Sequence, residues 1–166
     1  MNIRKANTQD VPTLLKLIHE LAIYEREPDA VKTTEDDLLR DGFGDNPLFQ
    51  CLVGEIDGKV EGLALYFFTW STWEGRPTLY LEDLFVREST RGKGLGLTLF
   101  KNLAKIAVEK KCQRFEWSVL DWNEPARSFY HQLGANHKEG WLPYRLEGEP
   151  LQKVANSIET HQALVV

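Results

Sequence analysis

The sequence predicts one α/β (α+β) domain over residues 1–166, built on a mixed sheet, and three observations support this prediction. The chain has 166 residues, of which 42% are apolar, which suits one substantial core and leaves little room for a second. The first half contains a strong hairpin signal, Asp57-Gly58, between two apolar strand patterns. The second half alternates strand and helix patterns, which is typical of a sheet covered by helices.

Local signals place each element along the chain. Thr34 and Asp37 in "TTEDDLL" are spaced as in a capping box and predict a short helix, which "DGFGDNP" ends. The elements expected in chain order are strands over residues 2–6, 48–56, 60–70, 78–86, 115–120 and 141–146, and helices over residues 8–24, 34–40, 95–110 and 123–133. Residues 157–166 show no clear pattern.

The composition narrows the classes of partner. With 20 basic and 25 acidic residues the net charge is -5, so the chain lacks the basic footprint of a nucleic-acid-binding protein, and a small cationic ligand suits it better. No apolar run has the length of a membrane span or a signal peptide. Cys51 and Cys112 form no CxxC motif and no metal-ligand spacing with histidines, which predicts reduced core thiols, a cytoplasmic protein and no metal site.

The segment "RGKGLG", Arg91 to Gly96, lies between a predicted strand and a predicted helix. Alternating glycines at this position let backbone N–H groups of the helix N-terminus point at a bound phosphate. The GxGxG spacing excludes the dinucleotide fingerprint GxGxxG, and no GK[ST] follows to make a Walker A loop. A glycine turn needed only for folding remains an alternative, although Arg91 and Lys93 favour an anion.

Arg91, Gly94 and Gly96 match the [QR]xxGx[GA] acetyl-CoA loop of the GNAT superfamily of N-acetyltransferases, and the element order resembles that fold. The stretches "LIHELAIYE", "DGFGDNP", "YLEDLFV", "WNEPARSFY" and "EGW" resemble the diamine (spermidine/spermine) acetyltransferase group. Within it, "STWEGR" and "VLDWN" are similar to the thialysine N-epsilon-acetyltransferase branch. The resemblance implies a mixed central sheet of six to seven strands with about four helices. Pro77 and residues 135–139 depart from the group's pattern.

The resemblance implies transfer of an acetyl group from acetyl-CoA to a terminal amine, with Glu82 and Tyr130 as catalytic residues. An alkyl ammonium has a pKa near 10.4, so Glu82 would accept its proton through water, and Tyr130 would protonate the departing thiolate. Successive strand residues face opposite sides, so Glu82 and Asp83 share a side only if the strand is bulged, as it is in the family. Without the resemblance, a surface acid and a core tyrosine are the commoner alternatives.

The resemblance also implies two sets of binding residues. Those expected to contact coenzyme A are Leu84, Val86, Arg91, Gly92, Lys93, Gly94, Leu95, Gly96, Asn123 and Tyr130. Those expected to contact the acceptor are Tyr24, Glu25, Trp73, Glu82, Asp83, Glu139 and Trp141. In relatives the acceptor site lies partly across a dimer interface, which implies a homodimer. The acids from Glu25 to Asp37 are otherwise read as a solvated face, the commoner role of a charge cluster.

The acceptor itself is left open between related amines. Thialysine, whose sulfur eases deprotonation of its amine, is the first expectation, and a diamine or polyamine is the close alternative. The carboxylate of a free amino acid needs a cation or polar group nearby, for which Arg76 is a candidate. A non-catalytic module that binds acyl-CoA, and a protein-lysine acetyltransferase with an open groove, are the alternatives from other classes.

Overall fold

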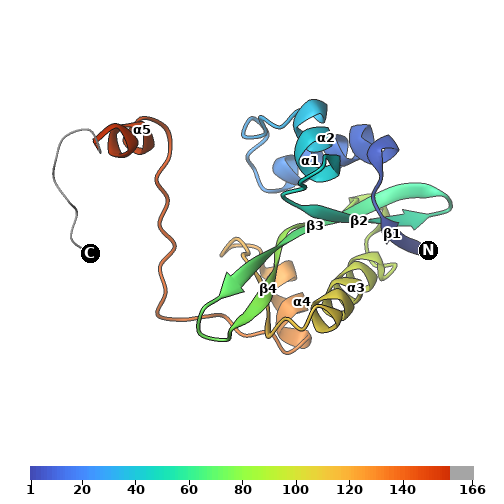
Figure 1. The fold of residues 1–166 in the computed structure, drawn as a ribbon. Coiled ribbons are helices and arrows are strands. Elements are labelled where there is room, and N and C mark those ends of the chain that lie inside the picture. The colour runs from blue at the N-terminus through green and yellow to red at the C-terminus, as the bar shows by residue number, and fades with distance from the viewer. Residues whose placement is uncertain (158–166) are drawn as a thin grey trace. The chain divides into compact units, whose positions relative to one another are not determined.

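The computed structural model describes residues 1–157, and the chain divides into two compact units, Met1–Leu120 and Asp121–Val166 (Figure 1). Each unit has its own helices, and the sheet belongs to the first. None of the helices in residues 1–157 combines the length and the apolar character needed to cross a membrane. The expectation of one domain over residues 1–166 stays a prediction.

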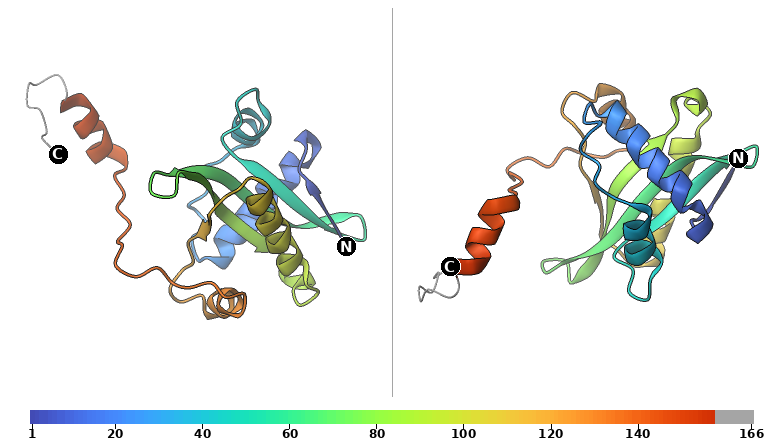
Figure 2. Two further views of the ribbon diagram at one scale, coloured as in Figure 1. Left: turned by 60° about the horizontal axis from the view of Figure 1, so that its bottom comes forward. Right: turned by 90° about the horizontal axis from the view of Figure 1, so that it is seen from above.

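The first unit is a mixed sheet covered by helices on both faces. Its elements are β1 (Asn2–Lys5), α1 (Val11–Tyr24), α2 (Glu35–Phe43), β2 (Gln50–Ile56), β3 (Lys59–Ser71), β4 (Arg76–Val86), α3 (Leu95–Glu109) and β5 (Arg114–Trp117). The five strands lie in chain order and are antiparallel, except that β4 and β5 are parallel. Helices α1 and α2 cover one face, and α3 covers the other (Figures 1 and 2).

The hairpin between β2 and β3 forms where the sequence predicted it. Asp57 and Gly58 have φ angles of 52° and 75°, so both central residues of the turn are left-handed, as a type I′ turn requires. The register then pairs Ile56 with Lys59 and Leu52 with Ala64. Because successive residues of a strand point to opposite faces, alternate side chains of β2 and β3 lie on each face of the sheet.

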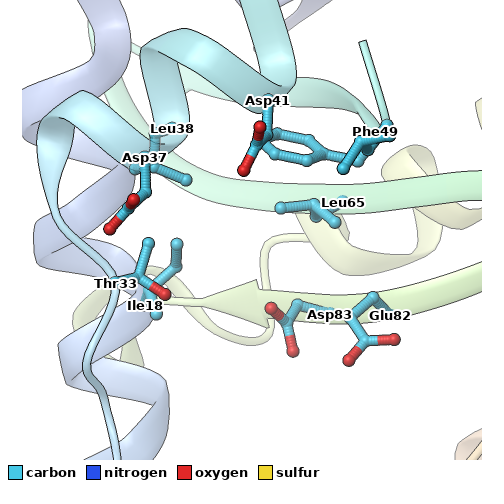
Figure 3. Close-up of a pocket in the computed structure, with 10 residues that line it drawn as sticks. Ile18, Thr33, Asp37, Leu38, Asp41, Phe49, Leu65, Glu82 and Asp83 are labelled. Atoms are coloured by element: carbon cyan, nitrogen blue, oxygen red, sulfur yellow. The ribbon is translucent and has the colours of Figure 1, made fainter. Parts of the chain in front are cut away.

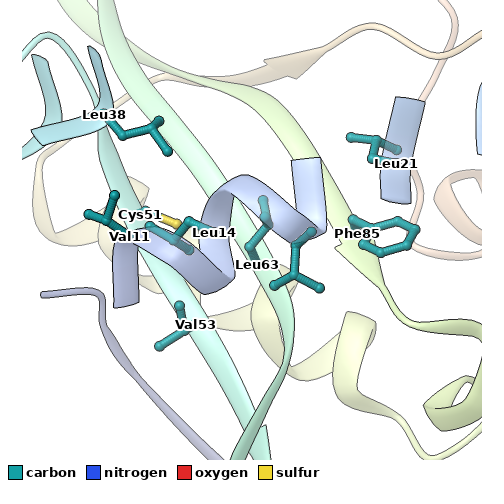
Figure 4. Close-up of a cluster of buried hydrophobic side chains, with 9 residues drawn as sticks. Val11, Leu14, Leu21, Leu38, Cys51, Val53, Leu63 and Phe85 are labelled. Atoms are coloured by element: carbon teal, nitrogen blue, oxygen red, sulfur yellow. The ribbon is translucent and has the colours of Figure 1, made fainter. Parts of the chain in front are cut away.

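The face under α1 and α2 carries a compact cluster of buried side chains (Figure 4). Its members are Val11, Leu14, Leu17, Leu21, Leu38, Cys51, Val53, Leu63 and Phe85. On the other face, Leu95 at the start of α3 is 1% exposed. A Cβ at Gly54 would lie 2.6 Å from Leu95 Cδ1, so glycine there allows the helix start to approach the sheet closely.

Up to residue 157, the second unit contains two helices, α4 (Glu124–Gln132) and α5 (Gly148–Asn156). The expected helix over residues 123–133 is confirmed, and the Asn123 side chain caps it by accepting a hydrogen bond from the Ala126 amide at 3.3 Å. Helix α5 was not predicted. Of the terminal residues 157–166, only Ser157 lies among those the structure describes.

The predicted strand over residues 141–146 is wrong. The segment has no regular secondary structure, and Leu142 and Tyr144 are exposed by 78% and 94%. Pro143 has no N–H to give to a ladder, so an apolar pattern alone does not make this segment a strand. Within residues 1–157 the sheet therefore has five strands instead of the six to seven expected, while the fold class agrees with the expectation.

Candidate functional site

A bulge in β4 places two acidic residues together. Asp83 pairs with Leu65 of β3, but the next residue of β3, Tyr66, pairs with Leu81, so Glu82 is an extra residue without a partner in this ladder. The bulge that the sequence required for both acids to share a side is therefore present. Glu82 and Asp83 line the same cavity.

This cavity has a volume of about 310 Å³ and lies within the first unit (Figure 3). Its walls come from α1, α2 and the segments that follow each of them, and from β3 and β4. The lining residues are Ile18, Thr33, Asp37, Leu38, Asp41, Leu48, Phe49, Leu65, Glu82 and Asp83. Four of them carry carboxylates and none carries a basic group, so the cavity suits a cation with an aliphatic part.

Asp83 is the most strongly perturbed carboxyl group of the cavity. Burial, the largest cause, and the neighbouring charges of Glu82 and Glu25 together raise its pKa to about 6. Burial also raises the pKa of Glu25. Glu82 and Glu25, which the resemblance also assigned to the acceptor site, thus lie close enough to Asp83 to repel its charge. A bound cation would relieve this repulsion.

Glu82 differs from Asp83 in its contact with solvent. Its side chain is exposed, whereas Asp83 is partly buried. An exposed carboxylate at the mouth of a cavity can exchange a proton with water, and a buried carboxylate is better suited to bind a charged group. The two neighbours therefore fit the separate roles that the resemblance implied for them.

The edge of β4 beyond the bulge is open. The ladder with β5 ends at the pair Leu81 and Trp117, whereas β4 continues to Val86. Leu84 and Val86 pair with β3 on the other side, opposite Ala64 and Gly62. In the sheet of residues 1–157, backbone groups on the β5 side of residues 82–86 thus lack strand partners. Apart from the Val86 carbonyl, which accepts a hydrogen bond from Arg91, they can face an extended ligand.

The glycine loop leads into α3 as predicted. Gly92 and Gly94 have φ angles of 78° and 82°, and Gly94 is the N-cap residue of the helix, so the turn itself requires both glycines. Gly96 has no such requirement, because a Cβ there would meet only Val86 Cγ2, at 3.6 Å. The first turn of α3 offers N–H groups that lack intrahelical partners, and exposed Lys93 lies beside them.

Arg91 connects this loop to the end of α1. Its Nε donates a hydrogen bond to the Val86 carbonyl at 3.1 Å, and its guanidinium lies 4.5 Å from the centre of the Tyr24 ring. Tyr24 therefore lies beside the loop and does not line the cavity. Leu95, assigned to the cofactor, buries its side chain in the core, which leaves its backbone N–H for a ligand. Trp73 lies between β3 and β4 and is 81% exposed.

The remaining predicted site residues belong to the second unit. Tyr130 lies on α4, and burial raises its pKa to about 12, so its hydroxyl stays protonated at neutral pH. Glu139 and Trp141 lie in the segment between α4 and α5, with Lys138 Nζ 4.9 Å from the centre of the Trp141 ring. The part that Tyr130, Asn123, Glu139 and Trp141 play in the site stays a prediction.

Sequence reasoning missed the contribution of α2 to the cavity. The predicted capping box is confirmed, since the Thr34 amide donates to Asp37 Oδ2 at 3.0 Å and the Asp37 amide donates to Thr34 Oγ1 at 3.2 Å. However, Asp37 also lines the cavity, together with Asp41 one turn later. The i, i+4 spacing of these two acids around buried Leu38 is the sequence signal that could have indicated it.

Residues 1–157 contain no group of three or more histidine, cysteine, aspartate or glutamate side chains placed to hold a metal ion. The candidate residues carry carboxylates, a phenol and backbone amides. Such groups can bind an ammonium, move protons and hold a phosphate.

Comparisons with protein families and with individual known proteins agree on one family. Residues 14–135 match the model of the acetyltransferase (GNAT) family. The chain is 43% identical over 164 residues to a thialysine N-epsilon-acetyltransferase of Sus scrofa, which covers 92% of this chain and 96% of that protein. It is 41% identical over 163 residues to spermidine/spermine N(1)-acetyltransferase-like protein 1 of Homo sapiens, covering 92% of this chain and 23% of that protein.

A solved structure supports the same fold. An integron cassette protein from the mobile metagenome of V. cholerae superimposes with a TM-score of 0.80 at 32% identity. The match covers 94% of this chain and 98% of that protein.

Proposed function

Since the chain belongs to the acetyltransferase (GNAT) family and takes its acetyl group from acetyl-CoA, we propose that it transfers this group directly to the terminal primary amine of thialysine or a related lysine analogue. The observation that carries the proposal is the bulge in β4, which lets Glu82 and Asp83 line the same acidic cavity. The name of the Sus scrofa relative supports thialysine as the acceptor.

The reaction requires that the acceptor lose a proton before attack. At pH 7, deprotonation of an ammonium with a pKa near 10.4 to the neutral amine costs roughly 4 to 5 kcal/mol. In the proposal Asp83 binds the ammonium, and exposed Glu82 accepts its proton through water. The neutral amine then attacks the thioester carbonyl carbon, the C–S bond breaks, and Tyr130 gives its phenolic proton to the thiolate of coenzyme A. The new amide nitrogen loses its second proton, which restores the phenol of Tyr130 through water.

The acetyl-CoA donor is held by groups that follow the bulge in the chain. The N–H groups at the start of α3, with Arg91 and Lys93, provide the anion site for the diphosphate. The open edge at Leu84 and Val86 offers backbone groups to the pantetheine arm. Asn123 caps α4, and its contact with the cofactor is a further part of the proposal.

A diamine or polyamine is the second candidate acceptor, and one observation favours it. The cavity is lined by four carboxylates and by no basic side chain, so the carboxylate of a free amino acid would be repelled there. The name of the Homo sapiens relative also supports a polyamine. Values of kcat/KM for thialysine, spermidine and lysine decide between them: a tenfold or greater advantage for spermidine would reverse the ranking.

A module that only senses acyl-CoA is disfavoured by the retained Glu82 and Tyr130. The test is an acceptor-amine screen with acetyl-CoA, in which release of coenzyme A is followed with and without each amine. Amine-dependent release supports the proposal. Binding of acetyl-CoA without release for any small amine would support the sensor instead.

Two further parts of the proposal concern the assembly and its compartment. We propose a homodimer, supported by the exposure of Trp73 and Trp141, which the family resemblance places near a partner. Sedimentation equilibrium at several concentrations tests it, and a monomer throughout would contradict it. A cytoplasmic location is supported by the free thiols of Cys51 and Cys112.

A further inference from the structure

The cavity has a second acidic wall that the proposed reaction does not use. Asp37 and Asp41 lie on α2, while Glu82 and Asp83 lie on β4 on the other side of the cavity (Figure 3). Spaced by four residues, Asp37 and Asp41 share one face of the helix. The cavity therefore offers two pairs of carboxylates from two different elements.

The surface between the two pairs is apolar. Ile18, Leu38, Leu48, Phe49 and Leu65 line the cavity, and Leu65 lies between the acids of α2 and those of β4 in Figure 3. Hydrocarbon chains bind to such a surface because their burial removes apolar area from water. A molecule with a cation at each end and an aliphatic chain between them would meet complementary groups along its whole length.

Arg40 modifies the charge of the α2 wall without cancelling it. Its guanidinium pairs with Asp37 at 2.9 Å and with Asp41 at 2.6 Å, so two carboxylates share one cation. Hydrogen bonds from Thr34 and the pairing with Arg40 lower the pKa of Asp37, which keeps it ionised at neutral pH. Arg40 does not line the cavity, and its side chain is 63% exposed. One negative charge on this wall thus remains for a ligand.

We propose that Asp37 and Asp41 bind a second ammonium group of the acceptor and so determine its specificity. This inference rests on the proposed function, since it assigns the far end of the same substrate. The second ammonium is the other terminus of a diamine or the α-ammonium of an amino acid such as thialysine. The alternative role for both acids is to hold Arg40 on the surface of α2, which would leave acceptor choice unchanged.

The test compares two acceptors of equal chain length, 1,5-diaminopentane and pentylamine, of which only the first has a second ammonium. Wild type should acetylate the diamine with the higher kcat/KM. Asp41→Asn should lower kcat/KM for the diamine about tenfold, as expected for loss of one partly exposed charged hydrogen bond, and for pentylamine less than about twofold. Asp41 is the first choice because Asp37 also caps the helix. Asp37→Asn is the second variant.

Asp36→Asn is the matched control, because Asp36 is an exposed acid on the same helix and is not among the residues lining the cavity. It should leave both acceptors unchanged. Thialysine is measured alongside. A similar loss for thialysine assigns the site to the α-ammonium of an amino acid, whereas a loss confined to the diamine assigns it to diamines.

An unchanged ratio of diamine to pentylamine in both Asp41→Asn and Asp37→Asn would overturn the inference even if acetylation itself is observed. Calorimetric titration with 1,5-diaminopentane separates this result from failure of the proposed reaction. In one outcome, wild type acetylates neither amine and yet binds the diamine, with Asp41→Asn binding it about tenfold more weakly. That result would support the second ammonium site and contradict the proposed reaction. If wild type does not bind the diamine, the inference falls.

Discussion

Asp83→Asn should stabilise the folded protein at neutral pH, because the structure holds this carboxyl group where its charge is disfavoured. Burial and the charges of Glu82 and Glu25 raise its pKa from 3.8 to about 6. At 1.36 kcal/mol for each pKa unit, this change corresponds to about 3 kcal/mol in the free energy of unfolding.

The pH dependence follows from the direction of this change. Below pH 4 the carboxyl group is protonated in both the folded and the unfolded protein, so Asp83 and an asparagine should contribute equally. Between pH 4 and pH 6 the folded protein keeps a proton that the unfolded chain has released, so stability falls as the pH rises. Above pH 6 the loss is complete. The advantage of Asp83→Asn should therefore grow from near zero at pH 4 to its full value at pH 7.

Urea unfolding followed by circular dichroism at pH 4, 5, 6 and 7 measures this difference. Asp36→Asn, which removes an exposed carboxylate, controls for the change in net charge and should show no such growth. An equal effect of Asp83→Asn at every pH, or a variant less stable than wild type at pH 7, would refute the account of Asp83 as a desolvated, repelled charge.

Four further predictions concern the chemistry and the loop. Tyr130→Phe should lower kcat about 100-fold or more while the calorimetric Kd for acetyl-CoA changes little, because the phenol acts only on the departing thiolate; unchanged turnover would remove Tyr130 from this role. Glu82→Gln should lose most activity at low pH, where the ammonium is hardest to deprotonate, and a pH profile parallel to that of wild type would indicate a binding role. Gly94→Ala should lower the free energy of unfolding by about 1 kcal/mol because its φ of 82° is strained for alanine. Gly96→Ala should leave stability within about 0.5 kcal/mol, because its Cβ would make only an ordinary contact with Val86 Cγ2, and should weaken coenzyme A binding about tenfold or more, because the Cβ would crowd a bound diphosphate; unaltered binding would show that the diphosphate lies elsewhere.

Signals that act within a few residues of the chain predicted the fold well. The Asp57-Gly58 turn and the capping box of Thr34 and Asp37 both form as expected. Each depends only on the backbone angles and hydrogen bonds of residues close together in the sequence. The bulge in β4 was expected from the family resemblance; the adjacent acids alone showed only that they share one side of the strand if it is bulged.

Features that depend on distant contacts were harder to predict. Residues 141–146 carry the apolar pattern of a strand, but a strand also needs the backbone of a neighbour. Asp37 and Asp41 look like surface acids in the sequence, where one caps a helix and both can pair with Arg40. Only the packing of α2 on the sheet, through Leu38, brings them to the same cavity as Glu82.

The desolvation of Asp83 connects the stability of the fold to acceptor binding. An ammonium bound beside Asp83 supplies an opposite charge, so its binding offsets the repulsion of Asp83 by Glu82 and Glu25. The repulsion that lowers the stability of the free protein thus increases the affinity for a cation. Because protonation of Asp83 removes that repulsion, acceptor affinity should fall below about pH 6 even though the amine remains fully charged. A cavity lined by neutral polar groups would fold more stably and bind the amine less well.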